Sequence, residues 1–276
     1  MTVNSAINLS TVKIMGILNV TPDSFSDGGK FLHTDLALQQ VEAMINDGAT
    51  IIDIGGESTR PGAAEVSETD ELARVIPLLK AIKENFTVEV SIDTSKAGVM
   101  EQAISYGADI INDVRALQND NCLNVMANTT VPICLMHMQG LPRTMQQAPK
   151  YNDLIGDISD FFKQRIDACL TAGIARERLI LDPGFGFGKT LSQNYQLLNQ
   201  LSAFKALGLP ILSGTSRKSM IGNLLSCEVT ERLAGSLTTA IIAMQQGASI
   251  IRVHDVKETV DALNILKATN NYHVLN

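Results

Sequence analysis

The stretch Gly247-Ala-Ser-Ile-Ile-Arg-Val-His-Asp255 decides how the chain is interpreted. It is typical of a helix end, a tight turn and a short strand. The β-branched residues of this strand suit burial on both faces of a sheet. Arg252 and His254 alternate with them, so both side chains point the same way at the carboxyl end of the strand. A cation beside an imidazole there indicates an anion site, unless both simply face solvent beyond the sheet.

The same pattern, Gly-Ala-x-Ile-Ile followed by a polar residue, recurs at 48–53 and 107–112. Each copy follows an amphipathic helical segment and ends in Asp53 or Asn112. A recurring supersecondary unit is the mark of a repeating architecture. Repeated helix–glycine–strand units predict parallel strands joined by helical crossovers. We therefore expect the polar strand ends to gather at one rim.

The rest of the chain supplies enough units for a closed barrel. We predict a strand beginning at Ile250 and seven others at 12–19, 50–54, 88–93, 110–112, 131–137, 179–182 and 210–214. Helices are expected at 36–45, from a capping box at 67–70 to about 85, after 94, at 153–172, briefly from 220, at 230–246 and at 256–269. The prediction is a single TIM (β/α)8 barrel over 1–276, one domain with long loops after the first two strands. An open doubly wound sheet is the alternative, but the chain has no dinucleotide fingerprint.

Composition restricts the class of protein. The chain has 276 residues and 45% hydrophobic residues, enough for a large core, and a net charge of −7. That charge argues against a nucleic-acid or membrane-surface binder. The four cysteines form no C-x-x-C pair, which indicates free thiols in a reducing compartment. No signal peptide or membrane span is apparent, so we expect a cytoplasmic protein.

Polar residues that end separate strands are the first candidates for a site, because a TIM barrel binds its ligand at the carboxyl ends of its strands. Asp93, Asn112 and Asp182 are placed in this way. Ionised groups in an apolar barrel need partners, and a heterocycle rich in N–H donors would supply them. Asp93 could instead cap the next helix. Capping is a weaker alternative for Asp182, because Pro183 and Gly184 begin a turn.

Cations form the second candidate group. Lys218, Arg252 and Arg60, with Asn19 as an oxygen ligand, suit a phosphate or diphosphate with Mg²⁺, although loop cations are often solvated. Residues 184–190 imitate a phosphate-binding loop, but Pro183 stands where that motif requires glycine. The loop could instead lay an aromatic ring against a flat ligand. The amides that begin the helix after Lys218 could hold a carboxylate beside Ser219. His33, His137 and His273 are taken as structural or solvated.

Two long motifs resemble the signatures of the dihydropteroate synthase family. They are Met15-Gly-Ile-Leu-Asn-Val-Thr-Pro-Asp-Ser-Phe-Ser-Asp-Gly-Gly29 and Asp53-Ile-Gly-Gly-Glu-Ser-Thr-Arg-Pro-Gly62. The segments 91–95, 111–113, 182–189, 216–220 and 252–254 are similar to the remaining family blocks. The resemblance therefore covers nearly the whole chain. It implies an enzyme that joins 6-hydroxymethyl-7,8-dihydropterin diphosphate to p-aminobenzoate, with release of diphosphate, in folate biosynthesis.

The resemblance also implies roles for individual residues. The pterin would be held by Asp93, Asn112, Asp182 and Lys218. The diphosphate would be held by Arg252, His254, Thr59, Arg60 and Asn19, the last through Mg²⁺. The p-aminobenzoate would be received by Ser219, Phe187, Phe25 and Pro61. Asp27, on the first loop, would face a methylene cation formed when diphosphate leaves first, and Arg252→Ala is expected to abolish most turnover while leaving the fold intact.

Two other functions remain open from the sequence. A pterin-binding methyltransferase that works with a corrinoid partner has a similar barrel, but has no use for a diphosphate clamp. A pterin-binding paralogue without turnover is expected to have lost loop or clamp residues. The resemblance further implies sulfonamide sensitivity and a homodimer formed through late helices. The apolar segment 237–244 fits such an interface, or ordinary packing against the barrel.

Overall fold

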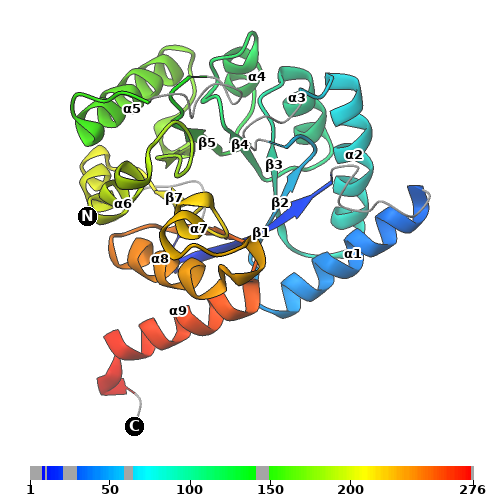
Figure 1. The fold of residues 1–276 in the computed structure, drawn as a ribbon. Helices are drawn as coiled ribbons and strands as arrows, with labels where there is room; N and C mark the ends of the chain where they lie inside the picture. Colours follow the sequence, from blue (N-terminus) through cyan, green and yellow to red (C-terminus); the bar gives the residue numbers. More distant parts are fainter. Residues whose placement is uncertain (1–7, 10, 21–29, 59–64, 141–148, 275–276) are drawn as a thin grey trace.

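The computed structural model describes residues 8–9, 11–20, 30–58, 65–140 and 149–274. Eight parallel strands form one sheet in the order β6-β5-β4-β3-β2-β1-β8-β7. A bridge between Leu181 and Ile211 joins the sixth strand to the start of the seventh and closes the ring. Figure 1 shows the strands at the centre with the helices around them. The predicted TIM barrel is confirmed.

The strands are short and follow the predicted order. Their bounds are β1 Lys13–Asn19, β2 Ile51–Gly55, β3 Glu89–Asp93, β4 Ile110–Asp113, β5 Ile133–Met136, β6 Leu179–Asp182, β7 Leu212–Ser213 and β8 Ile250–Val253. The predictions for β5 and β7 were too long. Pro132 and Pro210 lack the N–H that a ladder needs, so regular pairing begins only after them.

Helices follow every strand. The α-helices are α1 Lys30–Asn46, α2 Glu68–Asn85, α3 Ala97–Ser105, α4 Cys122–Ala127, α5 Leu154–Thr171, α6 Leu191–Asn199, α7 Ser219–Leu225, α8 Leu233–Gln245 and α9 Val256–Asn270. The 3-10 turns described are η2 Arg176–Arg178, η3 Leu201–Leu207, η4 Val229–Glu231 and η5 Tyr272–Val274.

Several helices differ from prediction in their bounds. Helix α1 begins at Lys30 and not at 36. The single helix expected at 230–246 is η4 followed by α8, because Glu228 and Glu231 cap η4 reciprocally. A helix was expected after every strand, but no bounds were predicted for α6, although Thr190 and Gln193 form a complete capping box at its start. None were predicted for α4 either, which at Cys122–Ala127 is too short for a periodic pattern. The helix start at Ser67 is confirmed, since its Oγ accepts from the Asp70 N–H.

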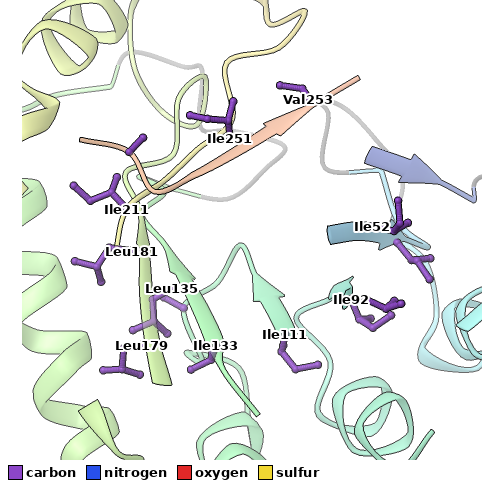
Figure 2. Packing of buried hydrophobic residues seen from close by; sticks show 14 of the residues in the cluster. Ile52, Ile92, Ile111, Ile133, Leu135, Leu179, Leu181, Ile211, Ile251 and Val253 are labelled. Atoms are coloured by element: carbon purple, nitrogen blue, oxygen red, sulfur yellow. The ribbon is translucent and has the colours of Figure 1, made fainter. Parts of the chain in front are cut away.

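The two faces of each strand separate two apolar layers. Outward residues such as Ile52, Ile111 and Leu135 pack under the helices in the main core, and Figure 2 shows them along the strands. Inward residues fill the barrel itself: Met15, Ile51, Ile110, Cys134, Ile180, Leu212 and Ile250. On β4, β6 and β8 the inward residue two positions beyond this apolar layer is polar: Asn112, Asp182 and Arg252. Polar side chains occupy the next level, and they form the candidate site.

No helix in the described part of the chain is long and apolar enough to cross a membrane. All four cysteines are free thiols, and three of them are buried.

Candidate active site

Strand register places the ends of four neighbouring strands at one level, and three of these end residues are polar. Asn19 pairs with Gly55, Gly55 with Asp93, and Asp93 with Asn112. Paired residues in a parallel sheet face the same side, so these side chains point into the mouth of the barrel together. Gly55 keeps the space open, since a Cβ there would lie 3.6 Å from Asn19 Oδ1 and 3.8 Å from Asp93 Cβ.

Arg252 of β8 is the centre of the charge network. Its Nε donates to Asp53 Oδ2 at 2.6 Å, and its Nη2 donates to Asp93 Oδ2 at 3.0 Å. Asn112 Nδ2 also donates to Asp53 Oδ2, at 3.3 Å. Burial lowers the pKa of Arg252, but Asp53, Asp93 and Asp182 together raise it above its usual value. The guanidinium therefore stays charged between carboxylates that come from distant parts of the chain.

The acids of this network lie away from water, which shifts their pKa values. Burial raises the pKa of Asp93, against the opposing effect of Arg252. Burial also raises the pKa of Asp182, while Lys218 and the Gly184 N–H lower it. Buried acids of this kind gain from a ligand that donates hydrogen bonds to them.

Asp93 does not cap the following helix. Lys96 is the residue before α3, and the Asp93 carboxylate pairs with Arg252. The capping alternative for Asp93 was therefore wrong. Asp182 Oδ1 accepts from Gly184 N at 2.8 Å, within the turn that follows β6. Asp182 ends β6 and Arg252 lies near the end of β8, so the parallel barrel brings both to the same mouth, where Arg252 lowers the pKa of Asp182 and Asp182 raises that of Arg252.

Lys218 lies at the start of α7, between the acids and the loop after β6. Its Nζ donates to the Phe185 carbonyl and lies 4.6 Å from the centre of the Phe187 ring. Burial lowers the pKa of Lys218 to about 8, although Asp182 and Asp93 raise it. Lys218 and Phe187, which the resemblance assigned separately to the pterin and to the p-aminobenzoate, are thus brought together as a cation over an aromatic face.

Residues at the start of helix α8 fix the turn that precedes Lys218. Arg217 has a φ of 56°, a left-handed conformation that is strained for a residue with a side chain. Its N–H donates to Ser236 Oγ at 2.9 Å, and its carbonyl accepts from Arg232 Nη1 at 3.0 Å. Its guanidinium pairs with Asp255 on the other side. These contacts fix the strained turn just before Lys218.

His254, at the end of β8, is paired with Ser216 from the loop after β7. Ser216 Oγ lies 3.0 Å from His254 Nδ1 and accepts from the His254 backbone N–H at 3.1 Å. A hydroxyl that donates to Nδ1 leaves the proton of a neutral imidazole on Nε2. Ser216 was not singled out by itself from the sequence, although it lies in the 216–220 block.

Asp53 is the other functional candidate that was not assigned. It is fully buried, and one of its oxygens bonds both Arg252 and Asn112. Its other oxygen, Oδ1, makes no hydrogen bond within the described part of the chain. The sequence did indicate a site position for Asp53, since this residue ends the copy of the repeated strand pattern at 48–53.

Ser219 and Asn19 occupy the predicted positions. Ser219 is the exposed first residue of α7, and Asn19 ends β1. Phe25, Asp27, Thr59, Arg60 and Pro61 lie outside the described residues. His137, taken as structural or solvated, is buried at the end of β5. Among the residues with described positions, no cluster of three or more His, Cys, Asp or Glu side chains could hold a metal ion.

Comparisons with known proteins agree with this geometry. The family profile described as "Pterin binding enzyme" matches residues 15–254. The dihydropteroate synthase of Escherichia coli is 56% identical over 96% of this chain and 94% of its own. That of Haemophilus influenzae is 53% identical over 97% of this chain and 98% of its own.

Solved structures give the same result. The Yersinia pestis dihydropteroate synthase in complex with a sulfonamide drug has a TM-score of 0.91 and 56% identity, over 96% of each chain. The Xanthomonas albilineans enzyme with 4-aminobenzoic acid has a TM-score of 0.90 and 44% identity, over 95% of this chain and 94% of that one. An acid-lined barrel mouth with buried cations and this family match define the class: a pterin-binding TIM-barrel transferase. Within that class, the chain belongs to the dihydropteroate synthases, enzymes of folate biosynthesis.

Proposed function

We propose that the barrel mouth binds the pterin diphosphate in two halves. Asp93, Asn112 and Asp182 hold the donor-rich heterocycle with Lys218. Arg252 and His254 hold the diphosphate, joined by Thr59 and Arg60 from the loop after β2. The main support for this proposal is the position of the Arg252 guanidinium, which donates hydrogen bonds to Asp53 and Asp93. The residue proposed to bind the diphosphate is therefore next to the acids proposed to bind the pterin. Asp53 belongs to the acid half, since its Oδ1 has no hydrogen-bond partner within the described residues.

The p-aminobenzoate would lie on the outer side of the pterin. Phe187, stacked under Lys218, supplies an aromatic wall, and the exposed Ser219 supplies a hydroxyl for the carboxylate. Phe25 and Pro61, from the two long loops, complete this half of the site. The complex of a relative with 4-aminobenzoic acid supports a site for this compound in the present chain.

The reaction breaks the bond between the pterin methylene carbon and the diphosphate oxygen, and the electron pair leaves with the diphosphate. Arg252 and the His254 Nε2–H stabilise the charge that grows on this leaving group. The Asp27 carboxylate is the group proposed to stabilise the resulting methylene cation. The lone pair of the p-aminobenzoate amine then forms the new C–N bond, and the amine proton passes to solvent. The neutral aniline needs no strong base for this step.

We propose Mg²⁺ as the cofactor, with Asn19 as its protein ligand. Mg²⁺ usually keeps several waters and is bound through one or two carboxylates plus substrate phosphates. Asn19 would supply an amide oxygen, which is also a hard oxygen donor, and the diphosphate and water would supply the remaining ligands. When bound, the ion would neutralise charge on the diphosphate.

The test is product formation from purified chain, pterin diphosphate, p-aminobenzoate and Mg²⁺. Dihydropteroate and diphosphate should appear together in equal amounts. Binding of the pterin diphosphate without product would favour a paralogue that has lost turnover. A corrinoid-dependent methyl transfer instead of condensation would favour the methyltransferase.

We further propose a single-domain homodimer that works in the cytoplasm. Large apolar side chains are exposed from the end of α7 to the start of α8: Leu224 at 56%, Leu225 at 53%, Val229 at 44% and Leu233 at 37%. Contiguous exposed apolar patches mark interfaces, and this segment is the part of the described chain that we propose for one. The segment 237–244, also considered for this role, instead buries Thr239, Ala240, Ala243 and Met244 within the chain. The free cysteines suit a reducing compartment.

A further inference from the structure

Lys189 is a buried cation that the reaction does not use. It follows the loop after β6, and only 2% of its surface is exposed. It forms no ion pair with any carboxylate whose position the structure describes. A buried ammonium without an ion pair is unfavourable for stability, so groups of this kind are concentrated at functional sites.

The ammonium is nevertheless fully hydrogen-bonded. Its Nζ lies 2.9 Å from the Gly184 carbonyl oxygen, 3.1 Å from the Phe187 carbonyl oxygen and 3.0 Å from His137 Nδ1. Three acceptors match the three N–H donors of a charged lysine. His137 can act as the third acceptor because burial, together with Lys189, lowers its pKa to about 2 and keeps the ring neutral.

These contacts join two neighbouring strands through one short loop. His137 follows β5, and both carbonyls belong to the loop 183–188 after β6. The loop lies against β5 so closely that a Cβ on Gly184 would stand 2.0 Å from the His137 carbonyl oxygen. Tyr151, which lies just before α5, also contacts this loop, since its hydroxyl donates to the Gly188 carbonyl at 2.8 Å.

The loop that Lys189 ties carries three groups of the candidate site. The Gly184 N–H orients the Asp182 carboxylate, and the Phe185 carbonyl accepts from Lys218 Nζ. The Phe187 ring lies under the same ammonium. A shift in this loop would therefore move an acid, a cation and an aromatic wall together.

We infer that Lys189, held on His137 Nδ1, is a positioning residue that fixes the 183–188 loop so that Asp182, Lys218 and Phe187 meet both substrates. This inference rests on the proposed function. Lys189 is buried, and it acts through its hydrogen bonds to the two loop carbonyls. Among the groups that shift the pKa of Asp182, Lys189 acts with Lys218 against burial and favours the ionised acid.

The test compares two buried cations that are both held by neutral acceptors. Arg178 is 6% exposed and donates to the Val131 and Met126 carbonyls and to Thr129 Oγ1, below the strands and away from the loop. Lys189→Met and Arg178→Met should both lower the midpoint of urea unfolding. Only Lys189→Met should weaken the binding of pterin diphosphate and raise KM for p-aminobenzoate, each by about 10-fold or more, because misplaced site groups have effects of this size. Affinity for inorganic diphosphate alone should stay within about twofold, since Arg252 and His254 are untouched.

A second pair of variants covers the case in which Lys189→Met does not fold. His137→Asn offers a side-chain oxygen near the position of Nδ1, whereas His137→Leu offers no acceptor. The asparagine variant should retain most of the pterin affinity that the leucine variant loses. Equal affinity in His137→Asn, His137→Leu and wild type would overturn the inference, as would equal ligand effects in Lys189→Met and Arg178→Met. Failure of the wild-type chain to form dihydropteroate would overturn the proposed function instead.

Discussion

Arg252 shows how a single residue can serve both packing and chemistry. The sequence placed it beside His254 at a strand end, and the structure adds the ion pairs with Asp53 and Asp93. Those partners lie 199 and 159 residues away along the chain, so no local pattern could reveal them. Because the side chain is only 19% exposed, its removal leaves buried carboxylates without a counter-charge. Arg252→Ala is then a poor test of catalysis, since loss of such a partner costs about 3–5 kcal/mol.

Arg252→Lys is the sharper change at this scale. Lysine keeps the positive charge but loses the planar fork that reaches two carboxylates at once. We expect kcat to fall by about 100-fold or more, the usual effect of removing one preorganised donor. Steady-state kinetics should be measured beside Arg178→Lys, which alters another buried guanidinium far from the mouth. A near wild-type kcat for Arg252→Lys would exclude its role at the leaving group.

At the scale of elements, the loop after β6 shows what sequence could and could not predict. Its alternating glycines indicated a flexible loop able to present a ring, and Phe187 does lie under Lys218. The loop is in fact tied at several points, with Gly184, Gly186 and Gly188 all at positive φ. Sequence alone could not show this, because glycine is equally common in mobile loops and in close backbone contacts.

Gly184→Ala tests whether close approach, and not flexibility, requires glycine here. The new Cβ would stand 2.0 Å from the His137 carbonyl oxygen, at a φ of 72°. Gly208→Ala is the matched control, with a φ of 66° and nothing within 4 Å of the new Cβ. We expect about 1 kcal/mol of destabilisation for Gly208→Ala from left-handed strain alone. Gly184→Ala should lose distinctly more in urea unfolding, together with pterin affinity; equal losses would contradict the close-contact explanation.

For the whole molecule, the barrel was predictable because its repeated unit is written three times in the chain. Strand ends could be listed, and register then brought Asn19, Asp93 and Asn112 to one level. The pairing of Arg252 with Asp53 depends on side-chain reach from β8 past β1 to β2, and the pairing of Lys189 with His137 depends on how the loop after β6 packs against the end of β5. Those distances are set by closure and by packing, so they cannot be read from spacing along the sequence.

Stability should depend on pH through His137. Burial lowers its folded pKa from 6.5 to about 2. Between these values the unfolded chain binds a proton at this site and the folded chain does not, so falling pH favours unfolding. Below pH 6 this residue should lower the free energy of unfolding of the wild type by about 1.4 kcal/mol for each pH unit of acidification. His137→Asn should lack that slope. Urea unfolding from pH 7 to pH 5 measures it; parallel curves for the two proteins would show that His137 is protonated when folded.

Lys189 should also make stability depend on pH, in a different pH range from His137. Burial lowers its pKa from 10.5 to about 7, although Asp182 raises it. The unfolded chain therefore binds more protons between pH 7 and 10.5, and this group makes the folded state more stable as pH rises through that range. Lys189→Met should remove that contribution, while the His137 slope below pH 6 should persist, because burial is the larger cause of the lowered His137 pKa. If the difference in unfolding free energy between wild type and Lys189→Met changed with pH only below 6.5, the lowered pKa of Lys189 would be contradicted.

The division of the mouth into an acid half and an anion half is tested most directly by calorimetric titration with two ligands. One is 6-hydroxymethyl-dihydropterin, and the other is its diphosphate. Asp182→Asn should weaken binding of both ligands by a similar factor, about 10-fold or more, because a charged acceptor is lost from the heterocycle side. His254→Asn should weaken only the diphosphate ligand. Unchanged binding in Asp182→Asn, or an equal loss of both ligands in His254→Asn, would contradict a single site built from these two halves.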